Sequence, residues 1–238
     1  MWRRWIGPAA LSAAALVSCG EGAGGTAERE VARLGDAYAG VELPAIEAPE
    51  IPADAPLVLF LGDSISAGLH LPAEYAFPAA AQRLLAAEGA PFRLANLGSS
   101  GDTSAGGLAR LDWALRAQPD VVVVELGGND GLRGISLAST ESNLRAIIER
   151  VRAAGAAPLL LGMRMPPNLG EYAAEFDALY PRLAAALDVP LVADFMQGVG
   201  GVADLNLPDQ LHPNPAGHAQ LARTLGPALR QVLAAVAR

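Results

Sequence analysis

Residues 121–126 read Val-Val-Val-Val-Glu-Leu, and this stretch decides the fold. Four β-branched valines in succession favour an extended strand, because a helix restricts their side-chain rotamers. A strand that is apolar on both faces is typical of a parallel sheet with helices on both sides. We therefore predict that residues 121–126 form a buried strand of such a sheet.

On either side of this strand, short apolar runs alternate with longer amphipathic runs from residue 56 onward. The other candidate strands are residues 57–61, 92–97, 157–163 and 190–195. The helical patterns cover residues 76–88, 103–117, 139–154, 171–187 and 214–236. This alternation predicts an α/β fold with a parallel sheet. Ligands of such folds bind at the carboxyl ends of the strands, so functional residues are expected just after each strand.

The composition limits the classes of protein to which the chain can belong. Its 238 residues suffice for one full core but are short for two domains, and the apolar fraction of 52% excludes a disordered chain. The chain has 25 acidic residues, 17 Arg and no Lys, for a net charge of -8, which argues against nucleic acid as a partner. With one cysteine and three histidines, no Cys/His zinc site is expected. No apolar run reaches 18 residues, so no transmembrane helix is expected.

The N-terminus has the pattern of an export signal. Arg3 and Arg4 precede an apolar run of about 12 residues, which is too short to cross a membrane. Cys19 follows Leu-Val-Ser at 16–18, and this resembles the lipobox of bacterial lipoproteins, which implies that Cys19 is lipidated. We predict a lipoprotein signal peptide over residues 1–18, a tether over 19–55 and one globular domain over 56–238. The protein is then exported and faces the periplasm, held at the membrane by its lipid only; a soluble periplasmic or secreted form is the alternative.

Four polar segments lie where a site is expected. They are Gly62-Asp63-Ser64, Ser99-Ser100-Gly101-Asp102, Gly127-Gly128-Asn129-Asp130 and Asp209-Gln210-Leu211-His212. Ser64 either presents a hydroxyl at the sheet edge or caps a helix. Gly101 and Asn129 either offer N–H donors or belong to plain turns. Asp209 either orients the His212 ring, which leaves its other nitrogen free as a base, or both residues belong to a surface cap of the last helix.

Together these segments contain every part of an acyl-transfer site. Such a site needs a nucleophile, a base, a carboxylate that orients the base, and donors for the developing oxyanion. The chain order of Ser64, Asp209 and His212 is compatible with a triad, and Asp194 at the end of the fifth strand is the alternative acid. The motif Gly-x-Ser-x-Gly is absent because Ser66 occupies its last position, which disfavours an α/β-hydrolase nucleophile elbow. We expect Asp63 and Asp130 to support neighbouring site residues through hydrogen bonds.

The same segments resemble the four sequence blocks of the SGNH, or GDSL, hydrolase family, and the likeness extends over residues 57–236. Residues 101–104 and 125–134 resemble one subgroup, the bacterial multifunctional acyl thioesterase/arylesterase/lysophospholipase. The resemblance implies a flavodoxin-like, three-layer fold with the strand order 2-1-3-4-5. It also implies that no metal or organic cofactor is required.

The resemblance further implies a role for each site residue. Ser64 is the nucleophile, His212 the base and Asp209 its partner. The oxyanion donors are the backbone N–H groups of Ser64 and Gly101 and the side chain of Asn129.

Two apolar loops are the candidate substrate pocket. We expect Gly131 and Leu132 after the third strand, and Met165 and Pro166 after the fourth, to contact an acyl or aryl group; core packing is the alternative. The expected function is a serine esterase for small aryl or acyl esters, with thioesters and lysophospholipids as further substrates. A carbohydrate O-deacetylase of the same fold and a non-catalytic ligand-binding lipoprotein are the alternatives. The oligomeric state stays open.

Overall fold

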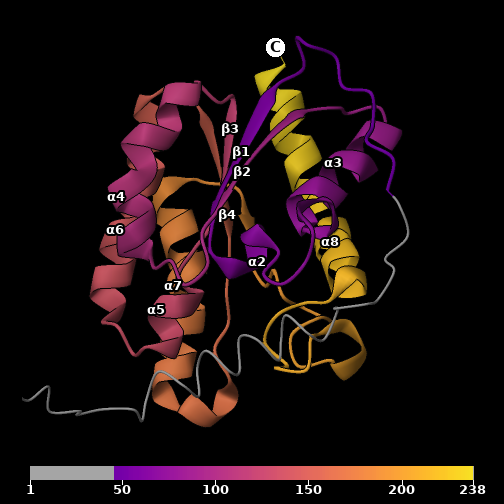
Figure 1. Ribbon diagram of the computed structural model, residues 1–238. Coiled ribbons are helices and arrows are strands. Elements are labelled where there is room, and N and C mark those ends of the chain that lie inside the picture. The colour runs from indigo at the N-terminus through magenta and orange to yellow at the C-terminus, as the bar shows by residue number, and fades with distance from the viewer. Residues whose placement is uncertain (1–45, 238) are drawn as a thin grey trace, which may run out of the picture.

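The computed structural model describes residues 46–237 and confirms the predicted α/β architecture (Figure 1). Five parallel strands form one sheet in the order β2-β1-β3-β4-β5, as the resemblance implied. The strands are β1 (Leu57–Gly62), β2 (Arg93–Gly98), β3 (Val121–Glu125), β4 (Ala157–Leu161) and β5 (Leu191–Val192). The α-helices are α2 (Ser64–Ala67), α3 (Phe77–Ala87), α4 (Ser104–Ala114), α5 (Gly128–Leu132), α6 (Leu137–Ala153), α7 (Glu171–Leu187) and α8 (Pro215–Val236). Short 3₁₀ helices are η1 (Ala73–Tyr75), η2 (Leu115–Ala117), η3 (Pro167–Leu169) and η4 (Ala203–Leu205).

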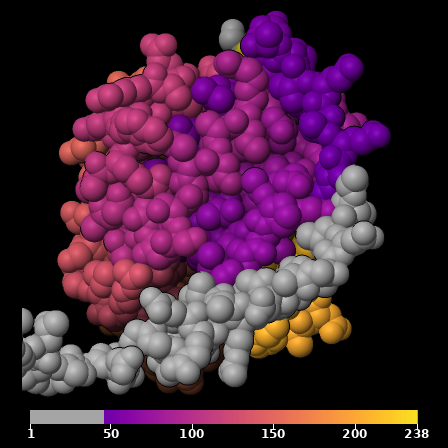
Figure 2. All heavy atoms as spheres, viewed as in Figure 1, coloured from indigo at the N-terminus to yellow at the C-terminus, as the bar shows by residue number. Residues whose placement is uncertain are grey.

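Helices cover both faces of the sheet, which gives the molecule three layers (Figure 1). Helices α3 and α8 pack together on one face, and α4, α6 and α7 lie next to one another on the other. All five residues of β3 are buried, as their apolar run predicted. The side of the molecule turned to the viewer in Figure 2 is formed mainly by the N-terminal half of the described chain.

An aromatic cluster joins the sheet to the α3–α8 layer. The ring of Phe77 on α3 lies 5.6 Å from that of Phe60 on β1 and 4.8 Å from that of Phe195, measured between ring centroids. His218 on α8 is buried beside Phe77, and its Nδ1 atom accepts a hydrogen bond from the Phe77 N–H (3.1 Å). This contact fixes α8, and the loop before it, relative to α3.

The structure corrects the prediction at the edges of the elements. The fifth strand pairs only at Leu191 and Val192, whereas residues 190–195 were expected, because the chain bends at residue 193. The 103–117 helix ends at Ala114 and continues as η2. The short helices α2 and α5 have no apolar period of their own, since each is a single turn that begins where a strand ends.

Candidate active site

Ser64 is the first residue of α2 and follows β1 almost directly. The Oδ1 atom of Asp63 caps this helix by accepting a hydrogen bond from the N–H of Ile65 (2.9 Å). The first N–H groups of a helix have no partner inside the helix, so the Ser64 hydroxyl lies beside backbone donors. Ser64 is 8% exposed and lines a cavity.

His212 joins Ser64 to Asp209 through its two ring nitrogens. Its Nε2 atom lies 2.9 Å from the Oγ of Ser64, and its Nδ1 atom lies 2.6 Å from the Oδ2 of Asp209. Partial burial alone raises the pKa of Asp209, but hydrogen bonds from the backbone and ring of His212 and from the Leu211 backbone outweigh it and lower that pKa. Asp209 is therefore held as an anion against the imidazole, as an acid that orients a base must be.

The loop that carries His212 is closed by its own backbone. The Leu207 N–H donates to the carbonyl oxygen of His212 (2.7 Å), and Asn206 pairs with Pro213 in an isolated antiparallel bridge. The Oδ1 atom of Asp209 accepts a further hydrogen bond from the His212 N–H (3.0 Å). These bonds fix the backbone of the loop at His212, and with it the position of the imidazole ring.

Asp194, the alternative acid, takes a different partner. Its Oδ2 atom lies 3.2 Å from the Nε of Arg164, which also lies 3.9 Å from Asp177. The structure thus brings Asp209, not Asp194, to His212.

The residues of the three expected oxyanion donors, Ser64, Gly101 and Asn129, line one cavity together with His212. The N–H groups of Ser64 and Gly101 have no hydrogen-bond partner among residues 46–237. Gly101 has a φ of 80°, a conformation that favours glycine, and its carbonyl oxygen accepts a hydrogen bond from Arg133 (2.9 Å). The Nδ2 atom of Asn129 donates to the Oδ2 of Asp63 (3.0 Å), which fixes the orientation of the amide.

The buried side chain of Asp130 joins α5, the helix that carries Asn129, to its neighbouring helices. Its buried carboxylate accepts hydrogen bonds from the N–H and hydroxyl of Ser104 on α4 (2.8 and 2.5 Å) and from the hydroxyl of Thr140 on α6 (3.2 Å). Gly127, with a φ of 109°, gives the chain its turn from β3 into α5, and a Cβ there would lie 2.2 Å from the Tyr180 hydroxyl. Asn129 thus lies on a short helix, α5, that Asp130 joins to both α4 and α6.

The cavity has a volume of about 610 Å³, and apolar side chains make up much of its wall. These are Ile65, Leu69, Leu132, Met163, Met165, Pro166, Pro167, Met196 and Leu211. Leu132, Met165 and Pro166 were expected there. Gly131 does not line the cavity: it lies buried behind Met165, so close that a Cβ at Gly131 would lie 2.4 Å from the Met165 Sδ. The sequence spacing alone did not show which side of helix α5 faces the cavity.

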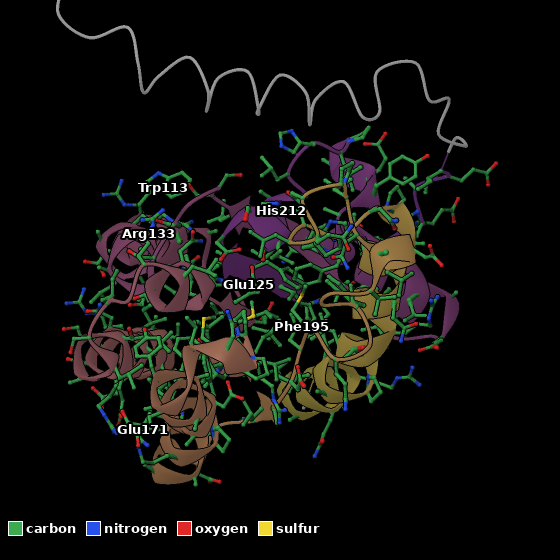
Figure 3. All side chains as sticks on the ribbon, turned by 90° about the horizontal axis from the view of Figure 1, so that it is seen from below. Trp113, Glu125, Arg133, Glu171, Phe195 and His212 are labelled. Atoms are coloured by element: carbon green, nitrogen blue, oxygen red, sulfur yellow. The ribbon has the colours of Figure 1, made fainter. Side chains whose placement is uncertain are left out.

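The sequence patterns did not identify three polar residues that the structure places around the site. Arg110 on α4 binds the carboxylate of Asp102 and the carbonyl oxygens of Leu97 and Gly62, and it thereby ties the ends of β2 and β1 together. Arg133 holds Gly101, and Glu125 lies under the Ser64 turn. Figure 3 shows Glu125 and His212 toward the middle of the molecule, with Trp113 and Glu171 at its periphery. The signal for Glu125 was available, as a lone acid ends the most apolar strand.

The described part of the chain contains no group of three or more His, Cys, Asp or Glu side chains arranged to hold a metal ion. Within the same part, none of the helices combines the length and the apolar character that crossing a bilayer requires. Cys19, the signal peptide and most of the tether lie outside the described residues, so these predictions stay predictions.

Comparison with known proteins decides the family. Residues 60–220 match the model of the GDSL-like Lipase/Acylhydrolase family. The chain belongs to this family. The resemblance drawn from the sequence is therefore confirmed, and this member of the GDSL family is a carboxylic ester hydrolase.

Three relatives resemble the chain over most of its length. Esterase TesA of Pseudomonas aeruginosa is 44% identical over 76% of this chain and 91% of that protein. Thioesterase 1/protease 1/lysophospholipase L1 of Escherichia coli K12 is 45% identical over 68% and 77%, respectively, and the arylesterase of Vibrio mimicus is 38% identical over 69% and 84%. A crystal structure of TesA superposes with a TM-score of 0.71 at 44% identity and covers 74% of this chain and 99% of that one.

Proposed function

We propose that this GDSL hydrolase cleaves aryl and acyl esters through a Ser64–His212–Asp209 triad and a covalent acyl-enzyme. The observation that carries the proposal is the chain of two hydrogen bonds through His212, 2.9 Å to Ser64 and 2.6 Å to Asp209. These distances suit transfer of the Ser64 proton to an imidazole that Asp209 holds in the correct tautomer.

In the acylation step, the Oγ of Ser64 attacks the ester carbonyl carbon while Nε2 of His212 takes the hydroxyl proton. Asp209 stabilises the imidazolium that forms. The carbonyl oxygen becomes an oxyanion, which receives hydrogen bonds from the N–H groups of Ser64 and Gly101 and from Asn129. When the C–O bond of the ester breaks, His212 donates the proton to the leaving alcohol or phenol.

Deacylation repeats these steps with water in place of Ser64. His212 removes a proton from the water, which attacks the acyl carbonyl carbon and releases a carboxylic acid. The Ser64 oxygen recovers its proton from the imidazolium. The route requires no metal ion and no organic cofactor, because protein groups supply each proton transfer and each charge contact.

The cavity favours an apolar acyl or aryl group as the substrate. Its volume of about 610 Å³ lies within the range of small-molecule sites, and methionine, leucine and proline side chains make up much of its wall. The names of the relatives include an esterase, an arylesterase, and a thioesterase and lysophospholipase. We propose that aryl esters and acyl esters are the main substrates, with thioesters and lysophospholipids as further ones.

We also propose that the enzyme is exported and held at a membrane, facing the periplasm, by a lipid on Cys19. Without residues 1–18 the chain has 15 Arg against 25 acidic residues, a net charge of -10 that gives it no attraction to anionic lipid, so the lipid is the expected anchor. Replacement of Cys19 by Ser should move the protein from the membrane fraction to the soluble fraction. A wild-type protein that is already soluble after export would contradict the anchor.

Initial rates on p-nitrophenyl acetate, butyrate and octanoate, and on acetylated xylan, test the proposed function. We expect turnover of the p-nitrophenyl esters and little release of acetate from xylan. A clear preference for xylan would favour a carbohydrate O-deacetylase instead. A folded protein without turnover on any ester would favour a non-catalytic ligand-binding lipoprotein.

A further inference from the structure

Glu125, the last residue of β3, lies completely buried beneath the turn that carries Ser64. Its Oε2 atom accepts three hydrogen bonds from this turn: from the Asp63 N–H (3.2 Å), the Ser66 N–H (3.2 Å) and the Ser66 hydroxyl (2.7 Å). Its Oε1 atom is also buried and has no hydrogen-bond partner among the described residues. A buried polar atom without a partner is costly, and the cost is far greater when the atom carries charge than when it is neutral.

Asp63 is a second carboxyl group in the same turn, and both of its oxygens are occupied. Oδ1 accepts a hydrogen bond from the Ile65 N–H and Oδ2 accepts one from the Asn129 amide. Both hydrogen bonds favour the charged form of Asp63 and oppose the rise that burial causes in its pKa. On Glu125, by contrast, all three donors contact Oε2, so a proton on Oε1 would displace none of these hydrogen bonds.

Among the described residues, no ion pair compensates two negative charges at this place, although the charge of a protonated His212 ring lowers the pKa of Asp63. Within residues 46–237 neither Asp63 nor Glu125 forms an ion pair; Arg110 on α4 reaches only the carbonyl oxygen of Gly62 nearby. Burial raises the pKa of Asp63, and burial together with the charge of Asp63 raises the pKa of Glu125 well above its usual range. Tyr180 on α7, whose own pKa burial raises, is the other titratable group close to Glu125. Two adjacent buried carboxyl groups in such surroundings share one proton.

We infer that Glu125 is a positioning residue that works in its neutral, protonated form, with the proton on Oε1. It holds the Ser64 turn through three accepted hydrogen bonds and leaves the negative charge of the pair to Asp63. The Asp63 carboxylate then orients the Asn129 amide toward the oxyanion. This inference rests on the proposed roles of Ser64 and Asn129. It adds that the protonation of Glu125 positions both residues, Ser64 through its turn and Asn129 through Asp63.

The substitutions Glu125→Gln and Glu125→Leu separate this role from its alternatives. Glutamine is a neutral group with the shape of a protonated glutamic acid, and its carbonyl oxygen accepts the same three hydrogen bonds. We expect Glu125→Gln to retain kcat on p-nitrophenyl butyrate to within about threefold. Glu125→Leu removes the acceptor, and we expect its kcat to fall by about 100-fold with little change in KM, because a small displacement of the nucleophile has that effect.

Two results would overturn the inference. If Glu125→Gln loses as much activity as Glu125→Leu, the turn needs a charged carboxylate. If Glu125→Leu keeps its activity, the turn needs no acceptor. Should Glu125→Leu not fold, Ser66→Ala deletes the shortest of the three hydrogen bonds and creates a smaller loss of kcat. Full activity of a folded Ser66→Ala protein would then count against the positioning role.

Infrared spectroscopy tests the proton without any turnover. We expect the carbonyl stretch of a protonated carboxyl group at pH 7 in the wild-type protein and in Ser64→Ala, and its loss in Glu125→Gln. A spectrum without this band in the wild type contradicts a neutral Glu125. Because Ser64→Ala gives the same band whether or not Ser64 is the nucleophile, failure of this inference and failure of the proposed function are distinguishable.

Discussion

The Nε2 atom of His212 lies 2.9 Å from the Oγ atom of Ser64, although 148 positions separate the two residues in the chain. Ser64 is placed by β1, and His212 by the loop that leads into α8. The contact of His218 with Phe77 joins α8 to α3, and the Phe77 ring in turn contacts the Phe60 ring of β1. The fold therefore sets base and nucleophile at proton-transfer distance without any movement of the loop.

The Asp209→Asn substitution tests the acid of the triad. An asparagine amide donates a hydrogen bond to Nδ1 of His212, which puts the ring proton on Nε2 and removes the base that Ser64 needs. We expect kcat to fall by about 10⁴-fold on p-nitrophenyl butyrate. Asp194→Asn is the matched control; it breaks a partly exposed ion pair with Arg164, so we expect a change of less than about fivefold. Equal losses in the two variants would reject the assignment of Asp209.

The Asn129→Ala substitution removes one oxyanion donor. Because this donor acts mainly on the charge of the transition state, we expect kcat to fall by about 10²–10³-fold with little change in KM. Steady-state kinetics on one ester provide both parameters. An effect confined to KM would mean that Asn129 binds the ground state and the transition state equally.

The Gly131→Ala substitution tests whether Met165 forms part of the cavity wall that contacts the acyl group. The added Cβ would lie 2.4 Å from Sδ and 2.7 Å from Cε of Met165, and 2.9 Å from the buried ring of Phe176. Met165 is the flexible one of the two side chains, so it should move into the cavity. We expect the ratio of kcat/KM for octanoate to that for acetate p-nitrophenyl esters to fall about tenfold, which is typical of a misfit of one or two methylenes. The control is Gly226→Ala on helix α8, where the new Cβ would lie no closer than 3.4 Å to any neighbouring atom, the nearest being Cδ2 of Leu84 on α3. A similar ratio in both variants would show that the acyl chain binds elsewhere.

The pH dependence of stability tests the environment of His218. Burial lowers the pKa of His218 from 6.5 to about 4, so the unfolded chain binds its proton first as the pH falls. The stabilising contribution of the neutral ring is present above pH 6.5 and is lost as the pH falls toward 4. This difference corresponds to about 3 kcal/mol.

Urea denaturation of the wild type and of His218→Gln at pH 7 and pH 4 measures this contribution. We expect the wild type to lose about 3 kcal/mol more than the variant between these values. Parallel losses in the two proteins would mean that His218 is protonated in the folded state or lies open to water.

The strands and their carboxyl ends were predictable from the sequence because both depend on local composition. Val121–Val124 are apolar on both faces, and the polar segments follow the strands directly, so their meeting at one edge follows from parallel topology. The length of β5 depends on a chain bend at residue 193, and the place of Gly131 depends on which side of the short helix α5 faces the cavity. The contacts of Glu125 and Arg110 cross between elements, so no periodic pattern contains them.

The covalent intermediate on Ser64 is the central claim, and mass spectrometry with a p-nitrophenyl alkylphosphonate tests it most directly. Such a reagent leaves a stable phosphonyl group on an activated serine. In the wild type we predict one added group per molecule, on the peptide that contains Ser64, and complete loss of esterase activity. In a folded Ser64→Ala protein we predict no labelling and at most about 10⁻⁴ of the wild-type activity. Labelling of another residue, or substantial activity in Ser64→Ala, would contradict the account.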